Sequence, residues 1–341
     1  MTAAPPVVVT GAGGWLGRNL VRALAPERDI VRVLVERPDE APLLELAGPS
    51  VEPVVGDVRD PVVVDRLFED MGGATVFHAA GVIHPAGRTR PFFDVNVGGT
   101  QLVVDRAQRA AAGRFVHISS NSPFGANARP SDRFTEESDP NPYLGYGRSK
   151  AEAESIVVRS AERGDLDAIV LRPPWFYGPW GPDRQAQFLR AVRTGRFPLV
   201  GNGRQQRSMI HSRNLVEACR CAEAATEGGG RAYWVADAEP YELRSIFDGI
   251  RAAMEAEGLP VSRWRGPRLP RLGARVAVHG DRVLQALDRY VQPLHVLGEL
   301  GDTIACDIAA ARRDLGYRPR VGLVEGMRES IRWHRDRGDA L

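Results

Sequence analysis

Several residue types are scarce in this 341-residue chain, and each scarcity excludes a class of protein. Three cysteines are too few for a disulfide framework. Cys219 and Cys221, two apart in a predicted helix, face different directions, which argues against a metal site. No apolar run approaches the ~20 residues of a membrane span. Lys and Arg number 45 against 43 Asp and Glu, so we expect no nucleic-acid or membrane partner.

The amino-terminal residues lead at once into an apolar run and a glycine turn, which leaves no room for a signal peptide. Together with the few cysteines, this predicts a cytoplasmic protein in a reducing compartment. The fractions of hydrophobic (43%) and charged (26%) residues are ordinary for a folded protein. The length suits one large domain or two domains that share a cleft.

Lysine is almost absent. Lys150 is the single lysine, and the other 44 of the 45 basic residues are arginines. Arginine is a wide, permanently charged fork, whereas lysine is a compact ammonium whose pKa can shift. A position that keeps lysine in such a chain indicates a site that requires the compact group. Lys150 is therefore the first candidate functional residue.

Short β-branched runs alternate with helical stretches in the first half of the chain. The predicted strands are Val7–Val9, Ile30–Val35, Val51–Val55, Ala74–His78, Arg114–Ser119 and Asp167–Leu171, and the predicted helices are Trp15–Ala25, Pro61–Met71, Val97–Ala112 and Tyr146–Arg163. This alternation predicts a parallel sheet covered on both faces. We therefore expect an α/β fold whose residues 1–172 form a doubly wound Rossmann domain, with ligands beyond the carboxyl ends of the strands.

The alternation of strands and helices ends after Arg172, where prolines interrupt it and loops rather than short strands separate the helices. The predicted helices are Arg184–Thr194, Asn214–Thr226, Leu243–Glu257, Leu272–Tyr290 and Val324–Arg337. Residues 173–341 are expected to form a smaller, mainly helical substrate-binding lobe, with some segments returning to the sheet. An arginine-rich stretch at Arg263–Arg275 is expected on the surface.

A glycine-rich segment, Thr10-Gly11-Ala12-Gly13-Gly14-Trp15-Leu16-Gly17, follows the first strand and opens the first helix. Its glycines permit a tight turn, close approach of the backbone to a pyrophosphate and close packing of helix on sheet. The free N–H groups at the helix start would bind the phosphates. The segment lacks the Gly-Lys-Ser/Thr of P-loop enzymes. It predicts a dinucleotide cofactor held by Gly11, Gly14, Trp15, Leu16 and Gly17.

This glycine spacing resembles the extended short-chain dehydrogenase/reductase (SDR) family, that is, the NAD-dependent epimerase/dehydratase family, and the resemblance runs across nearly the whole chain. It implies further cofactor contacts at Asp57 and Val58 after the third strand, at Ala79, Ala80 and Gly81 after the fourth, and at Pro173 after the sixth. Asn96 resembles the family's helix-stabilising asparagine.

The catalytic residues are assigned by the same resemblance. Tyr146-Gly147-Arg148-Ser149-Lys150 matches the family's Tyr-x-x-x-Lys, so the single lysine falls in the catalytic pair. The two side chains lie one helical turn apart. A nearby ammonium and the nicotinamide cation would lower the phenol's pKa from its usual value of about 10. Tyr146 would then exchange a proton with a substrate hydroxyl, while Lys150 bonds the nicotinamide ribose.

The segment from Ser119 to Gly125 resembles the family's Ser-Ser-x-x-x-Tyr-Gly when it is aligned on the final glycine. This alignment makes Ser120 the third catalytic member, a hydrogen-bond partner for the reacting oxygen, with Ser119 as the weaker candidate. Asn121 and Ser122 stand where related dehydratases and decarboxylases carry acidic residues. Because neither side chain can act as a general acid or base, the sequence favours simple redox chemistry at one carbon.

The second strand ends at Glu36 and Arg37, which point to different cofactors. An acidic side chain at this place bonds the adenosine ribose hydroxyls and favours NAD. Arginine can instead hold the 2′-phosphate of NADP. We favour NAD over NADP on the strength of Glu36.

Two residues in the second half bear on the substrate. Members of the family that act on nucleotide-linked sugars usually carry Asn where this chain has Trp175, which supplies an apolar stacking face instead. Arg207 matches the arginine that often holds a nucleotide diphosphate. These residues, with Ser120, Asn121 and Ser122, are the predicted substrate contacts.

The first hypothesis is an NAD(P)-dependent nucleotide-sugar epimerase that works through a transient ketone. The alternative is a dehydrogenase or ketoreductase similar to 3β-hydroxysteroid dehydrogenases, acting on a sterol-like or natural-product alcohol. A non-catalytic dinucleotide-sensing protein is a third, weaker possibility, because the residues of the catalytic set are present. The resemblance also implies a homodimer formed through the helices predicted at Val97–Ala112 and Tyr146–Arg163.

Overall fold

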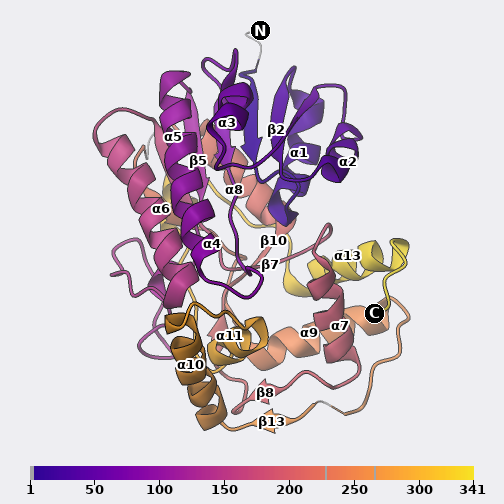
Figure 1. Ribbon diagram of the computed structural model, residues 1–341. Helices are drawn as coiled ribbons and strands as arrows, with labels where there is room; N and C mark the ends of the chain where they lie inside the picture. Colours follow the sequence, from indigo (N-terminus) through magenta and orange to yellow (C-terminus); the bar gives the residue numbers. More distant parts are fainter. Residues whose placement is uncertain (1–3, 227–228, 265) are drawn as a thin grey trace.

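Seven parallel strands form the central sheet, in the order β11-β6-β5-β4-β1-β2-β3 (Figure 1). The structure is a computed structural model that describes residues 4–226, 229–264 and 266–341. The first three residues and residue 265 of the arginine-rich stretch lie outside the described residues. The strands are β1 (Val7–Thr10), β2 (Val31–Val35), β3 (Val51–Val55), β4 (Thr75–His78), β5 (Arg114–Ile118), β6 (Ala168–Arg172) and β11 (Ala232–Trp234).

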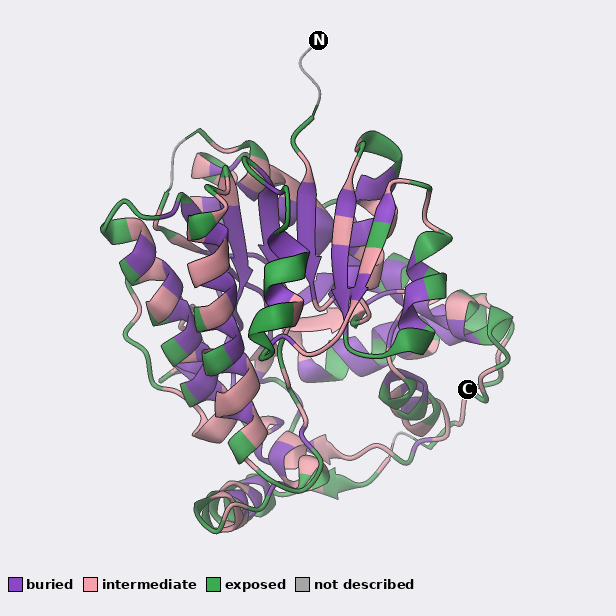
Figure 2. Ribbon diagram, turned by 45° about the horizontal axis from the view of Figure 1, so that its top comes forward, coloured by how far each residue is buried: buried purple, intermediate pink, exposed green. Residues whose placement is uncertain are grey.

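Helices cover both faces of this sheet, as expected for a doubly wound fold. Val7 and Val9 of β1 enter one buried cluster and Val8 enters another, because side chains alternate across a strand. The inner strands are accordingly buried almost throughout, whereas the edge strand β3 also carries exposed and half-buried residues (Figure 2). The helices that follow these strands are α1 (Trp15–Leu24), α2 (Ala41–Glu45), α3 (Pro61–Phe68), α4 (Arg90–Phe93), α5 (Thr100–Arg109), α6 (Leu144–Glu162) and α8 (Ser212–Ala224).

The parallel strands β1 and β4 lie side by side at the centre of the sheet, and the order in which the chain adds strands changes direction there, from β1-β2-β3 on one side to β4-β5-β6 on the other. Ligands of such sheets bind at this switch point, beyond the carboxyl ends of the strands. The residues that follow β1, β4 and β5 are those that the sequence assigns to the cofactor and to catalysis. The Rossmann fold predicted from the sequence is confirmed.

The second half builds a separate apolar cluster below the sheet. Its helices are α7 (Asp183–Arg193), α9 (Leu243–Ala256), α10 (Arg271–Ala286), α11 (Gln292–Glu299), α12 (Ala309–Asp314) and α13 (Leu323–Asp336), and its short strands are β7 (Trp175–Tyr177), β8 (Leu199–Val200), β9 (Gln206–Arg207), β10 (Met209–His211), β12 (Tyr241–Glu242) and β13 (Arg268–Leu269). Strand β11 returns to pair with β6. The domain boundary at residue 172 stays a prediction.

Two predicted helices differ from the structure. A π-helix over Asp94–Gly99 precedes α5, where a regular helix from Val97 to Ala112 was predicted. The single helix predicted at Leu272–Tyr290 was wrong at its end: Asp288 adopts φ +56°, and a new helix, α11, begins at Gln292. Aspartate tolerates this left-handed conformation better than most residues, so it can end a helix.

None of the helices in the described part of the chain is both long and apolar enough to cross a membrane.

Candidate active site

The glycine turn between β1 and α1 has no room for side chains. Gly11 adopts φ +67°, and a Cβ there would lie 2.7 Å from the backbone of Ala79 and Ala80. A Cβ at Gly17 would collide with the backbone of Gly11 and Ala12. Gly14 caps α1 without a side-chain hydrogen bond, so the first N–H groups of the helix stay available. This cradle fits a dinucleotide pyrophosphate, because backbone donors and space coincide.

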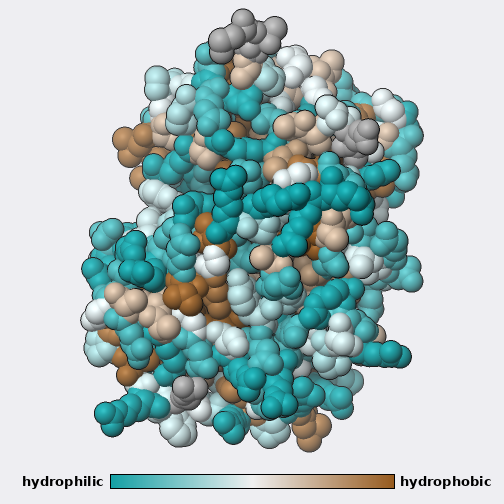
Figure 3. All heavy atoms as spheres, turned by 180° about the vertical axis from the view of Figure 1, so that it is seen from behind, coloured by the Kyte–Doolittle hydropathy of each residue, from teal (hydrophilic) through white to brown (hydrophobic). Residues whose placement is uncertain are grey.

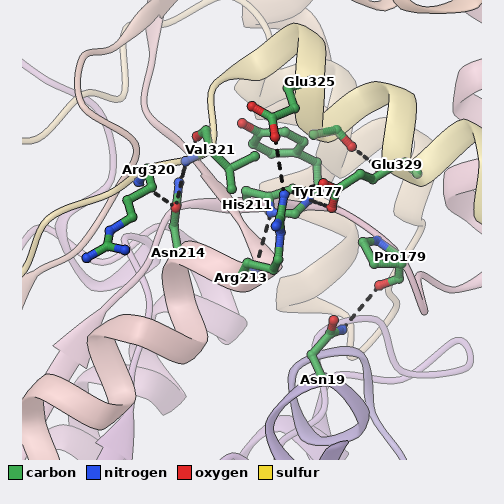
Figure 4. Close-up of polar contacts among 12 residues, drawn as sticks. Asn19, Tyr177, Pro179, His211, Arg213, Asn214, Arg320, Val321, Glu325 and Glu329 are labelled. Carbon is green, nitrogen blue, oxygen red and sulfur yellow. Dashed lines mark hydrogen bonds and ion pairs between the residues drawn. The ribbon is translucent and has the colours of Figure 1, made fainter. Parts of the chain in front are cut away.

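The glycine turn is tied to the second half of the chain through the start of α1. The Trp15 indole donates to the carbonyl of Pro179 over 2.8 Å, and the Asn19 amide donates to the same carbonyl over 3.1 Å (Figure 4). The Trp15 ring also packs edge-on against Phe176, at 6.0 Å between ring centroids. The segment after β7 therefore lies against the predicted phosphate site.

The carboxyl end of β2 carries a second negative charge, that of Glu40, in addition to that of Glu36, on which the sequence prediction of NAD rests. Glu36 is exposed, with Arg37 next to it. Arg37 forms ion pairs with Asp39 (3.2 Å) and Glu40 (3.0 Å). The Glu40 carboxylate is buried and lies directly over Gly13 of the glycine turn. Sequence reasoning missed Glu40, because only the fold of the short turn before α2 brings it back to the glycines.

The turns after β3 and β4 complete this side of the cleft. Asp57 pairs with Arg59, which lowers the pKa of the Asp57 carboxyl, and Val58 is buried beneath Gly99. The Ala80 N–H donates to the Thr10 hydroxyl over 3.2 Å, which fixes the turn from Ala79 to Gly81 beside Gly11.

Asn96 holds the segment that follows this turn. Its side chain accepts from the Val82 N–H (2.7 Å) and donates to the Val82 carbonyl (3.1 Å) and to the Ser149 hydroxyl (2.9 Å). It thereby links the loop after β4 to the helix that carries Tyr146 and Lys150, consistent with the stabilising role that its resemblance implied.

Tyr146 and Lys150 both lie in the first turns of α6, beside the end of β5. The Lys150 ammonium donates to the Ile118 carbonyl over 2.7 Å and lies 3.5 Å from His117 Nε2. Ser120 follows β5 and is buried, and its hydroxyl accepts from the Ser122 N–H over 3.2 Å. The Ser120 hydroxyl also lies near enough to the Tyr146 phenol to lower its pKa. The three predicted catalytic side chains thus lie together beyond the carboxyl end of β5.

Burial dominates the acid–base properties of this pair. It raises the pKa of Tyr146 to about 12, while the nearby Ser120 hydroxyl and the charge of Arg184 lower it. Burial also lowers the pKa of Lys150 to about 8, and the negative charge of Glu154 counteracts that effect. The lowered phenol pKa expected from the sequence is therefore not a property of the side chains alone, and it requires the cationic nicotinamide.

Glu154 connects the catalytic helix to two strands. Its carboxylate accepts from the Ser119 hydroxyl over 2.7 Å and from Arg172 Nε over 3.0 Å, and Arg172 Nη2 binds it as well. The Arg172 guanidinium lies 4.4 Å from the centre of the Phe124 ring. Because Glu154 is one turn beyond Lys150 and Ser119 adjoins Ser120, this buried ion pair positions the catalytic set. Sequence reasoning did not assign it a role.

Several of the predicted substrate residues are buried rather than exposed to solvent. Asn121 and Ser122 are buried in the turn between Ser120 and α6, and the Ser122 carbonyl accepts from the Tyr143 N–H over 3.1 Å. The Arg207 side chain is 1% exposed, with its guanidinium 4.7 Å from the centre of the Trp175 ring and bonded to the Glu299 carbonyl.

Arg184 is an unpredicted neighbour of Tyr146. It lies in the first turn of α7, and its charge acts on Tyr146, Tyr290 and His84. His84 Nδ1 lies 2.5 Å from the Tyr290 hydroxyl. The Tyr290 ring lies 5.5 Å from Phe92, whose ring lies 5.8 Å from Tyr146. Neither Arg184 nor Tyr290 lies in a recognisable motif, so only the fold brings them to the cleft.

A Rossmann sheet with a glycine cradle, and a Tyr-x-x-x-Lys pair beside a serine, define an enzyme of the extended SDR type. The sequence pattern of the NAD dependent epimerase/dehydratase family matches residues 7–236. The chain belongs to this family and is an NAD(P)-dependent enzyme.

Both curated proteins and solved structures are similar to this chain. It is 33% identical to a 4-hydroxy-2-methyl-3-oxo-4-farnesyl-3,4-dihydroquinoline-1-oxide ketoreductase of Stigmatella aurantiaca, over 94% of this chain and 93% of the relative. It is 32% identical to a 3 beta-hydroxysteroid dehydrogenase/Delta 5-->4-isomerase of Mycobacterium tuberculosis, over 96% and 90%. Among solved structures, UDP-glucuronic acid 4-epimerase from Bacillus cereus in complex with NAD has a TM-score of 0.76 at 18% identity, over 97% and 99%. At that identity the likeness concerns the fold alone.

Proposed function

We propose that this protein is a dehydrogenase or ketoreductase that interconverts a secondary alcohol and a ketone on a bulky, apolar substrate, and releases its cofactor after each turnover. The sequence alone put a nucleotide-sugar epimerase first and this function second. We reverse that order because of the way Arg207 packs against Trp175.

The main observation in favour of an apolar substrate is the packing of Arg207 against Trp175. A diphosphate would need the Arg207 guanidinium to face the cleft as an accessible fork. It is buried instead and covered by the Trp175 ring, with Nη2 bonded to the Glu299 carbonyl and with Nε and Nη1 unpartnered among the described residues. Trp175 therefore replaces a polar sugar-nucleotide contact by an aromatic face and also covers the arginine behind it. An apolar ring system or chain would pack on that face without the cost of desolvating a diphosphate.

The names of these two curated relatives support the proposal of an apolar substrate. One is named for a farnesylated ketone and the other for a steroid alcohol, and each shares about a third of its residues with this chain over nearly its full length. Neither name refers to a nucleotide-linked sugar. The substrate class proposed for this chain is the feature that these names share, an oxygen function on a large apolar framework.

The chain's own residues would supply proton transfer and orientation. When bound, the nicotinamide accepts or returns the hydride. The Tyr146 phenol would exchange the proton with the substrate oxygen, and the neighbouring Ser120 hydroxyl would donate to the same oxygen. The ammonium of Lys150 would turn from the Ile118 carbonyl to the ribose hydroxyls and favour the phenolate.

We also propose that the cofactor is NAD rather than NADP. Arg37, the residue that could hold a 2′-phosphate, is already paired with Asp39 and Glu40, and the pKa of its guanidinium is raised by those carboxylates. With Glu36 next to it, this end of the cleft carries net negative charge. A 2′-phosphate would be repelled there, whereas ribose hydroxyls could donate to a carboxylate.

The homodimer expected from the sequence belongs to the same proposal. Helices α5 and α6 pack side by side on one face of the sheet. We expect two copies to join through this face. Light scattering should give twice the chain mass, and a single copy in solution would contradict the expectation. The cytoplasmic location stays a prediction.

The experiment that tests the proposed function is identification by mass spectrometry of any dinucleotide released when the purified, untreated protein is denatured. A dehydrogenase or ketoreductase that exchanges its cofactor should yield little or none. NAD or NADH at about one per chain would mean a cofactor recycled within each turnover, and would favour the epimerase instead. The ratio of kcat/KM with NADH to that with NADPH tests the cofactor preference separately.

A further inference from the structure

Helix α10 presents an unpartnered apolar stripe to solvent. The stripe consists of Leu272, Val276 and Val283 of the helix and Leu287 at its C-cap, whose exposed fractions are 69%, 65%, 52% and 67%. Their separations of four, seven and four residues place them on one side of the helix, since eleven residues make about three turns. The opposite side is buried through Ala274, Ala277 and Asp281. The free side of the helix therefore carries this apolar stripe, interrupted by the exposed His279.

Such a stripe differs from the other exposed apolar residues of the chain. The others are spread along the chain, in or next to several elements and loops: Leu43, Leu46, Val62, Ile83, Trp264, Val291 and Val324. Scattered residues of that kind are ordinary on a folded protein, but four aligned on one helix mark an interaction surface. The face seen in Figure 3 is mostly hydrophilic, with smaller hydrophobic areas between the charged side chains.

A row of arginines runs beside the stripe. Arg271, Arg275 and Arg282 are exposed, and in the described part of the chain no carboxylate forms an ion pair with any of them. The acidic residue of the helix, Asp281, faces inward, where its carboxylate binds His295 Nδ1 (2.7 Å) and Gln285 (3.0 Å). The free side of α10 is therefore apolar and cationic, with no acidic side chain of its own.

We propose that α10 docks the protein on the surface of an anionic lipid bilayer, with the stripe in the outer acyl region and the arginines at the phosphate headgroups. A second copy fits this face less well, because a two-fold contact would bring the same arginines toward each other. The sequence argument against a membrane partner used overall charge and spanning runs. This local surface lies outside that argument, and the helix would lie on the bilayer rather than cross it.

The docking surface adjoins the active site. Gln285 of α10 accepts from the Gly145 N–H at the start of the catalytic helix, over 3.1 Å. Beyond the end of α10, Asp288 accepts from the Thr89 N–H and hydroxyl, and Tyr290 contacts the loop after β4 through His84. In Figure 1, α10 lies at the foot of the molecule next to the lower end of α6. An apolar substrate dissolved in the bilayer would thus have a short path to Tyr146.

The test is co-sedimentation of the full-length protein with vesicles of phosphatidylcholine alone or mixed with phosphatidylglycerol. Wild-type protein should bind the mixed vesicles, bind phosphatidylcholine weakly, and dissociate as salt is raised. The variant Leu272→Glu/Leu287→Glu should lose about ten-fold or more of this binding, because each change removes apolar contact and adds repulsion. Leu46→Glu/Val62→Glu is the matched control, since its residues are similarly exposed but lie away from α10, at the end of α2 and in α3.

Three outcomes would overturn the proposal. Wild-type protein could fail to bind anionic vesicles, or the control variant could lose binding as strongly as the α10 variant. Light scattering could also reveal that Leu272→Glu/Leu287→Glu dissociates an oligomer, in which case a second copy covers this face. Circular dichroism and the kcat of the α10 variant with a water-soluble ketone should match the wild type, which separates lost docking from lost folding. That activity control also distinguishes failure of docking from failure of the proposed function.

Discussion

The variant Glu154→Gln tests the role of the buried ion pair beside the catalytic set. The side chains of Glu154 and Arg172 are each 10% exposed, so removal of the negative charge leaves a buried guanidinium without a counter-charge. Loss of one partner of such a pair costs about 3–5 kcal/mol. Glutamine keeps the shape and one acceptor oxygen, so we expect a loss of about 3 kcal/mol in the free energy of unfolding.

The same variant should change the pH dependence of activity. Burial holds the pKa of Lys150 at about 8, and the charge of Glu154 counteracts a larger depression. The ammonium is present below this pH and is lost above it. Without the Glu154 charge the pKa of Lys150 falls, so the alkaline decline in kcat should begin at a lower pH than in the wild type.

Denaturant unfolding and a pH profile of ketone reduction measure the two effects. Glu162→Gln is the matched control, because it removes the same charge from an exposed position of the same helix. It should change stability by no more than about 0.5 kcal/mol and leave the profile in place. An unchanged alkaline limb in Glu154→Gln would refute the electrostatic part of the reasoning. A stability loss below about 1 kcal/mol would refute the buried-pair part.

Three further predictions concern the catalytic pair and the glycine turn. Tyr146→Phe should lower kcat by about 10²–10⁴-fold while the cofactor Kd, measured by fluorescence titration, stays unchanged. Lys150→Arg should not restore activity, because the guanidinium is too wide for a side chain that is 5% exposed; wild-type-like kcat in this variant would contradict the account. Gly11→Ala should destabilise the protein and weaken cofactor binding about ten-fold or more, since its Cβ meets backbone at 2.7 Å. Gly73→Ala, with a similar φ of +71° and open space, should cost only about 1–2 kcal/mol of backbone strain and leave cofactor affinity intact.

The sequence was informative where function depends on local spacing. The glycine turn needs three glycines in seven residues, and Tyr146 and Lys150 need one helical turn between them, so both features can be read directly from the chain. The alternation of strands and helices likewise predicted the Rossmann sheet, because each element carries its own periodicity.

The sequence was less informative where distant segments meet. Glu40 reaches the glycine turn and Arg184 reaches Tyr146 only after the chain has folded, and neither residue lies in a motif. The diphosphate role expected for Arg207 followed from its motif, yet its packing against Trp175 depends on three separate strands and loops. The end of α10 was missed because Asp288, rather than a glycine or proline, reverses the chain there.

The central claim is that this enzyme carries out net redox on an apolar ketone or alcohol with an exchangeable NAD. The most direct test supplies deuterated NADH with a steroidal or farnesylated ketone, and in parallel with a UDP-sugar, and follows the label by mass spectrometry. The account predicts that the apolar alcohol product carries the deuterium and that one NAD is released per product. Epimerisation of the UDP-sugar without net consumption of NADH, and no turnover of the apolar ketone, would contradict it.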